Sequence, residues 1–126
     1  MSELQHFTIV GEHAEYRPTG QVTTSQMVQL VAAAIALARG LHLRKLLVVT
    51  TGLVGFNPPD LATRYFFVKE WARVARGDVY VAMVARPEMI DPEKFGVTVA
   101  ANHGLCGDIF ESESEKAALA WLKSRA

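Results

Sequence analysis

Two short continuous runs of apolar residues, 45–50 and 79–85, constrain the fold of this chain more than any other feature. Each run has the length of a strand and lacks a regular polar alternation, which is typical of parallel strands buried on both faces. The segment between them predicts a helix over residues 61–76, with Asp60 as its N-cap and Gly77 at its end. A buried strand, a helix and a second buried strand predict a right-handed crossover in an α/β protein.

The N-terminal part of the chain predicts a hairpin followed by a helix. Residues 7–10 and 14–17 are rich in strand-forming residues and are separated by a turn. Thr23 and Gln26 match a capping box that opens a helix, and Gly40 suits the left-handed position after its end. The second half of this helix is apolar on all sides. We therefore expect it to pack on the sheet and also on a neighbouring helix or a second subunit, which favours a homodimer.

The C-terminal part of the chain continues the alternation of strands and helices. Asp91 is placed to start a helix that ends near His103, and residues 108–110 predict a last strand. A second capping box at residues 112–115 predicts a final helix. We expect a single STAS-like α/β domain over residues 1–126, with a mostly parallel five-stranded sheet and four helices in the order β-β-α-β-α-β-α-β-α.

The composition argues against several classes of function. Thirteen Lys and Arg residues balance thirteen Asp and Glu residues, and a net charge of zero argues against a nucleic-acid partner. One cysteine cannot form an internal disulfide, and the four histidines are too widely spaced for a metal site, so we expect neither metal nor cofactor. The longest apolar run, 30–38, is shorter than the ~20 residues of a membrane span, and the N-terminus lacks a signal-peptide pattern. These features predict a cytoplasmic protein without a membrane partner.

The order of elements and a set of local sequences resemble a known family. The local sequences are residues 20–23 before the first helix, 45–49 in the buried strand, and a C-terminal group of 102–104, 109–110, Ala117 and 121–122. On these residues the chain resembles the SpoIIAA-like proteins, relatives of the STAS domain (sulfate transporter and anti-sigma-factor antagonist). The resemblance implies a small non-enzymatic module that binds a partner protein or a small ligand and has a regulatory role. Some members of this group are similar to lipid-carrying SEC14 domains, which implies an alternative, a carrier of an apolar small molecule.

The phosphorylation switch of the anti-sigma antagonists is not reproduced in this sequence. In those proteins a phosphorylated serine at the start of the second helix controls partner binding, and the helix N-terminus stabilises the phosphate. Residues 57–63 contain no serine, Thr63 is the nearest hydroxyl, and Asp60 already brings a negative charge to the N-cap. The candidate ligand- or partner-binding residues in and beyond this region are Phe56, Asn57, Asp60, Thr63, Phe66 and Arg73.

Two loops are the expected place of a bound ligand. Open α/β sheets bind ligands at the carboxyl ends of their strands, which is where residues 53–56 and 86–88 are predicted to lie. The segment 53–56 is apolar, and it can line an apolar pocket or simply pack on the core.

The phase of the second helix sets Phe66 apart from the other aromatic residues. At ~100° per residue, a stripe that includes Leu61, Tyr65 and Val68 faces the sheet, and Phe66 falls on the opposite side. An exposed aromatic side chain with cationic neighbours such as Arg73 is typical of an interface anchor, although isolated exposed apolar residues are also normal.

A third interpretation is a small enzyme that uses His103 and Cys106, with Asp108 as the orienting group. Members of a catalytic triad are rarely so close in sequence, so we expect no catalytic residue here. The apolar neighbours Leu105 and Ile109 predict instead that Cys106 is buried, structural and slow to react with thiol reagents.

Overall fold

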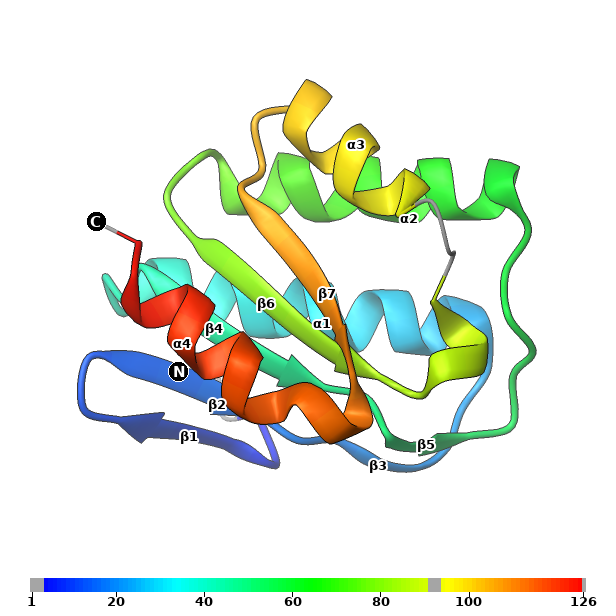
Figure 1. Ribbon diagram of the computed structural model, residues 1–126, viewed down its shortest axis with the longest axis horizontal. Coiled ribbons are helices and arrows are strands. Elements are labelled where there is room, and N and C mark those ends of the chain that lie inside the picture. The colour runs from blue at the N-terminus through cyan, green and yellow to red at the C-terminus, as the bar shows by residue number, and fades with distance from the viewer. Residues whose placement is uncertain (1–3, 91–93, 126) are drawn as a thin grey trace.

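The chain folds as an α/β protein with alternating strands and helices along most of its length (Figure 1). The computed structural model describes residues 4–90 and 94–125, which contain seven strands, four α-helices and two short 3₁₀ helices. The strands are β1 (Phe7–Val10), β2 (His13–Tyr16), β3 (Thr19–Gln21), β4 (Lys45–Val49), β5 (Gly52–Val54), β6 (Tyr80–Ala85) and β7 (Gly107–Glu111). The helices are α1 (Thr24–Gly40), α2 (Leu61–Ala75), η1 (Pro87–Met89), α3 (Phe95–Asn102), η2 (Ser112–Ser114) and α4 (Glu115–Lys123).

Five strands form the main sheet, in the order β1-β2-β4-β6-β7. β1 and β2 are an antiparallel hairpin, and every other neighbouring pair is parallel. Side chains alternate along a strand, so Leu46 and Val48 of β4 belong to the core on one face and Leu47 and Val49 to the core on the other. All four are buried, which confirms that the first apolar run is a central strand covered on both sides.

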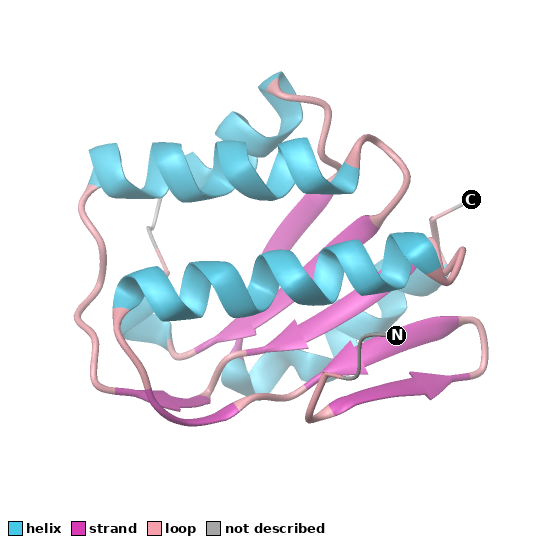
Figure 2. Ribbon diagram, turned by 180° about the vertical axis from the view of Figure 1, so that it is seen from behind, coloured by secondary structure: helices cyan, strands magenta, loops and turns pink. Residues whose placement is uncertain are grey.

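The helices cover the two faces of this sheet unequally. α1 and α2 lie side by side on one face, with α3 packed against α2 and β7, while α4 lies on the opposite face (Figures 1 and 2). We call these the α1–α2 face and the α4 face. On the α1–α2 face, the indole Nε1 of Trp71 in α2 donates a hydrogen bond to the carbonyl oxygen of Val28 in α1, 3.0 Å away. In the apolar second half of α1, the side chains of Val31, Ala34, Ile35 and Ala38 are buried in the same core as residues of α2 and of the sheet, so a neighbouring helix and the sheet cover this part of α1.

A second, two-stranded sheet was not expected from the sequence. β3 and β5 pair in parallel just beyond the ends of β2 and β4. A Cβ atom on Gly52 would lie 2.9 Å from Cγ2 of Thr19, and one on Gly55 would lie 2.7 Å from Cγ of Gln21. Small residues therefore let the two strands approach. Three-residue strands that contain glycine carry no readable periodicity, so the sequence pattern indicated only a loop here.

Local details at helix ends differ from the expectation in two places. Gly40 remains inside α1, and His42, with φ of 59°, takes the left-handed conformation instead. The expected capping box of Ser112 and Glu115 is absent, because residues 112–114 form η2 and the Glu115 carboxylate binds Arg17. The helix start expected at Asp91 falls outside the described residues.

The capping box of Thr23 and Gln26 is confirmed. Thr23 Oγ1 accepts from the Gln26 backbone N–H at 3.1 Å, and Gln26 Oε1 accepts from the Thr23 backbone N–H at 2.9 Å. Asp60 caps α2 as expected, accepting from the Thr63 backbone N–H at 2.7 Å. These caps fix where α1 and α2 begin and so place the loops that precede them.

Candidate functional site

An apolar cavity of about 110 Å³ lies between α2, α3 and strands β6 and β7 on the α1–α2 face. The buried residues that line it are Met27, Thr50, Val68, Trp71, Val81, Ala85, Ala100 and Leu105. Half-buried or exposed residues that line it include Phe56, Pro59, Arg64, Phe67, Met83, Arg86, Met89, Lys94, Val97, Gly107, Asp108 and Ile109. The cavity thus has an apolar floor, and its charged groups belong to residues that solvent reaches.

Four of the more exposed lining residues follow the carboxyl ends of strands. Phe56 and Pro59 lie in the segment between β5 and α2, Arg86 directly follows β6, and Met89 is in η1. Ligands of open parallel sheets bind in this part of the fold. Phe56 and Arg86, from the two loops where a ligand was expected, line the cavity, whereas Leu53 is fully buried in the core.

Two arginines of the cavity are held by backbone carbonyl groups. Nε and Nη1 of Arg64, in the first turn of α2, donate to the carbonyl oxygens of Pro59 at 3.2 Å and Met89 at 3.1 Å. Nη2 of Arg86 donates to the carbonyl oxygen of Leu53 at 3.1 Å. Neither guanidinium forms an ion pair with a carboxylate among the described residues.

The third cation of the cavity is neutralised. Nζ of Lys94 lies 2.9 Å from Oδ1 of Asp108, and the same oxygen accepts from the backbone N–H of Ile109 at 2.8 Å. Lys94 also lies over the ring of Phe110, 5.5 Å from its centroid. This pair adds no net charge to the lining, so its positive charge comes from Arg64 and Arg86.

The other candidate residues of the α2 N-terminus do not line the cavity. Asn57, Asp60 and Thr63 are exposed. The hydrogen bond from the Thr63 backbone holds the pKa of the Asp60 carboxyl below its usual value. Asp60 is therefore an ionised N-cap, and the structure gives it no second role.

Phe66 and Arg73 lie on the exposed side of α2, as the helix phase predicted. Phe66 is 68% exposed and meets the ring of Tyr65 edge-on at 5.6 Å between centroids. Arg73 is paired with Glu70, with Nη2 2.6 Å from Oε2. The expected burial of Leu61 is wrong. Leu61, the first residue of α2, is 56% exposed, and the buried residues of this helix begin at Val68.

The expected burial of Cys106 is wrong. Cys106 is exposed, in the turn between α3 and β7, although the next residue toward the N-terminus, Leu105, is buried as part of the core. The apolar residues next to Cys106 in the sequence therefore did not predict its burial, because successive side chains in a turn point in different directions. His103 is also exposed and packs against Tyr65 at 5.9 Å between centroids. No hydrogen bond joins His103, Cys106 and Asp108 in the described part of the chain.

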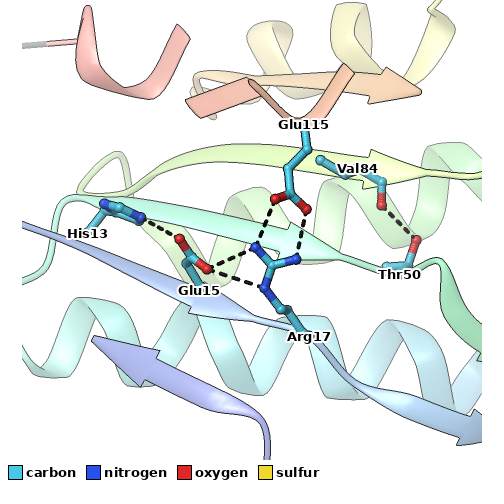
Figure 3. Close-up of polar contacts among 6 residues, drawn as sticks. All are labelled: His13, Glu15, Arg17, Thr50, Val84 and Glu115. Carbon is cyan, nitrogen blue, oxygen red and sulfur yellow. Dashed lines mark hydrogen bonds and ion pairs between the residues drawn. The ribbon is translucent and has the colours of Figure 1, made fainter. Parts of the chain in front are cut away.

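A charged cluster lies on the α4 face (Figure 3). Arg17 bridges two carboxylates: Nη2 is 3.0 Å from Oε1 of Glu15, and Nη1 is 2.7 Å from Oε1 of Glu115 at the start of α4. Nε2 of His13 lies 2.9 Å from Oε2 of Glu15. Burial acts to raise the pKa of Glu15, but the hydrogen bonds from His13 and Arg17 outweigh it and the pKa is lowered. The hydrogen bonds from Arg17 also lower the pKa of Glu115.

Comparison with known proteins gave no match to a protein-family model, to a curated protein or to a solved structure. In the described residues, no three His, Cys, Asp or Glu side chains gather in a way that would hold a metal ion. Over the same residues, no helix combines the length and the apolar character that crossing a membrane requires.

Proposed function

We propose that this chain is a non-enzymatic, cytoplasmic binding module of the STAS and SEC14-like type whose cavity takes a small apolar ligand. The observation that carries the proposal is the cavity itself, with an apolar floor under α2 and α3 and more exposed residues at the carboxyl ends of the strands. Natural binding sites combine such an apolar lining with a few polar groups that orient the ligand. The STAS-like assignment is supported by a hairpin that leads into a parallel sheet of alternating strands and helices.

Binding without chemistry is the simplest use of this site. The polar groups that line it are two arginines anchored to carbonyl oxygens, a Lys94–Asp108 pair, and the Thr50 hydroxyl, which donates to the carbonyl oxygen of Val84 at 3.2 Å. A nucleophile paired with a general base, which covalent catalysis requires, is not among these groups.

The proposal is tested by filling the cavity. Ethylbenzene is titrated into ¹⁵N-labelled protein, and amide shifts are expected in residues that line the cavity, such as Val81 and Met83. Ala100, which lines the cavity and is 4% exposed, is replaced in Ala100→Leu to occupy the ligand's volume and abolish these shifts.

Ala101→Leu provides the matched control for this experiment. It makes the same change at the next position of α3, which is exposed and does not line the cavity. Ethylbenzene should shift the same amides in this variant as in the wild type. Absence of binding to the wild type, or equal binding to Ala100→Leu and Ala101→Leu, would contradict the proposal.

A second candidate function, protein binding, is favoured by the exposure of Phe66. An exposed aromatic ring beside charged side chains resembles the anchor and rim of an interface. Phe66→Ala is expected to change the free energy of unfolding by less than ~1 kcal/mol, as for other surface positions. Sedimentation velocity at several concentrations tests whether Phe66 supports the homodimer: wild-type association that disappears in Phe66→Ala would support it, and unchanged behaviour of the variant would contradict it.

A further inference from the structure

The size of the cavity restricts the ligand. Its volume is about 110 Å³, which is smaller than the ~150 Å³ cavity that accommodates benzene in a protein core. Sites that enclose drug-sized molecules measure about 300–1,000 Å³. The enclosed part of the ligand is therefore no larger than one small ring or a short branched chain, and a longer chain would extend beyond the cavity.

The arginines that line the cavity indicate what the other end of the ligand carries. A guanidinium has five N–H donors. Among the described residues, the carbonyl contacts use two N–H donors of Arg64 and one of Arg86, which leaves three donors of Arg64 and four of Arg86 for other partners. The carbonyl contacts also hold both side chains in place, so little side-chain entropy is lost when an anion binds.

Both arginines line the cavity, and both are close to η1. Arg64 contacts Met89 of η1, and η1 directly follows Arg86 in the chain. Both side chains are only half-exposed, and the described residues supply no carboxylate for either. Cationic groups that lie in a partly apolar setting and have no carboxylate partner among the described residues favour an anion, and a planar guanidinium matches carboxylate and phosphate oxygens in a bidentate way.

We propose that the ligand is a small apolar molecule ending in an anionic group, a carboxylate or a phosphate, which the guanidinium groups of Arg64 and Arg86 bind while the apolar end fills the cavity under Ala100. This inference rests on the ligand-binding function proposed above and names its ligand class. A neutral compound of the same shape binds more weakly because it forms no charge-assisted hydrogen bond.

The test compares phenylacetate, phenylphosphate and phenylacetamide by isothermal titration calorimetry on the wild-type chain at low salt. At least one of the two anions is expected to bind about tenfold more tightly than phenylacetamide, the difference that one charge-assisted hydrogen bond supplies. Arg86→Gln is expected to reduce this preference to less than about threefold. Arg73→Gln removes the same charge from an exposed position away from the cavity and should leave the preference unchanged.

The outcomes separate this inference from the proposed function. If ethylbenzene binds and the anions show no advantage over phenylacetamide, the anionic class is wrong and the apolar site remains. If neither ethylbenzene nor any of the three compounds binds, both proposals fail. An anion preference that survives in Arg86→Gln would overturn the role of that arginine. The wild-type comparison needs no variant, so it decides the ligand class even if Arg86→Gln does not fold.

Discussion

The two faces of the main sheet are stabilised in different ways. Among the described residues, nineteen buried apolar residues form the core on the α1–α2 face, and six form the core on the α4 face. α4 contributes only Ala118 and Leu122 to the smaller core. At its N-terminal end it is tied to the strands by the ion pair of Glu115 with Arg17.

The cavity belongs to the larger of the two cores. The nineteen buried residues of that core come mainly from α1, α2, α3 and the strands that these helices cover, and several of them line the cavity. The smaller core holds six buried residues under one short helix, and there the chain adds charged contacts at the edge.

The largest effect is expected from a truncation on the α1–α2 face. Ile35→Ala removes a fully buried side chain of α1 and should lower the free energy of unfolding by about 4 kcal/mol. Because α1 packs on both the sheet and α2, this loss should affect the whole molecule. Chemical denaturation followed by far-UV circular dichroism checks the magnitude, and a loss below about 1 kcal/mol would mean that this core is loosely packed.

A truncation on the α4 face should act more locally. Leu122→Ala removes the larger of the two side chains that α4 buries, with an expected loss of about 3 kcal/mol. Hydrogen exchange should then show faster exchange of α4 amides, while amides of β4 and α1 keep more of their protection. Equal loss of protection across α1, β4 and α4 would show that the two faces unfold as one unit, which would contradict the expected local unfolding of α4.

Removing the charged link of the α4 face should have a smaller effect. Arg17→Gln breaks the contacts with Glu15 and Glu115, and because Arg17 is 44% exposed we expect a loss of only about 0.5–1 kcal/mol. Salt screens exposed ion pairs, so the difference from the wild type should shrink at 1 M NaCl. The variant Arg73→Gln, which breaks the more exposed pair with Glu70, serves as the control and should change stability less. A larger loss in the control would contradict the importance assigned to the α4 link.

The smallest effect is the pH dependence of this link. The pKa values of Glu15 and Glu115 are lowered in the folded chain, so their stabilising contribution is present above the ordinary carboxyl pKa and is lost as the pH falls through the lowered values. The stability difference between the wild type and Arg17→Gln should therefore be constant near pH 7 and decrease on the acid side of about pH 4.5. Melting temperatures measured from pH 7 to pH 3 check this, and a difference that grows in acid would contradict the sign.

The sequence predicted the elements whose signals are local. The apolar run around Leu47 and the capping box of Thr23 are complete within a few residues, and both were found. The exposure of Phe66 follows from helix periodicity alone, and it was also predicted correctly. The β3–β5 pair was missed because its strands are short and contain glycine, and their pairing depends on contacts between distant segments.

The candidate site was predicted only in part, for a similar reason. The loops of Phe56 and Arg86 were expected at the carboxyl ends of the strands, and the cavity includes both. The residues of its floor, however, come from several elements, among them α2, α3 and β6. No sequence motif predicts that residues such as Ala100 and Leu105 lie close together there. The sequence does not single out Arg64, because its contact with Met89 spans twenty-five positions and exists only in the folded chain.

The two tryptophans lie on different faces of the sheet, so tryptophan fluorescence can follow each face. Trp71 lines the cavity on the α1–α2 face, whereas Trp121 on the α4 face packs near Phe110, with its ring 4.7 Å from the Arg125 guanidinium carbon. Their emission therefore depends on different surroundings: a ligand bound in the cavity would perturb the indole of Trp71, and release of α4 would expose that of Trp121 to water. Replacing either residue with phenylalanine would leave a chain whose fluorescence reports on one face alone, so occupancy of the cavity and detachment of α4 can be followed as separate signals.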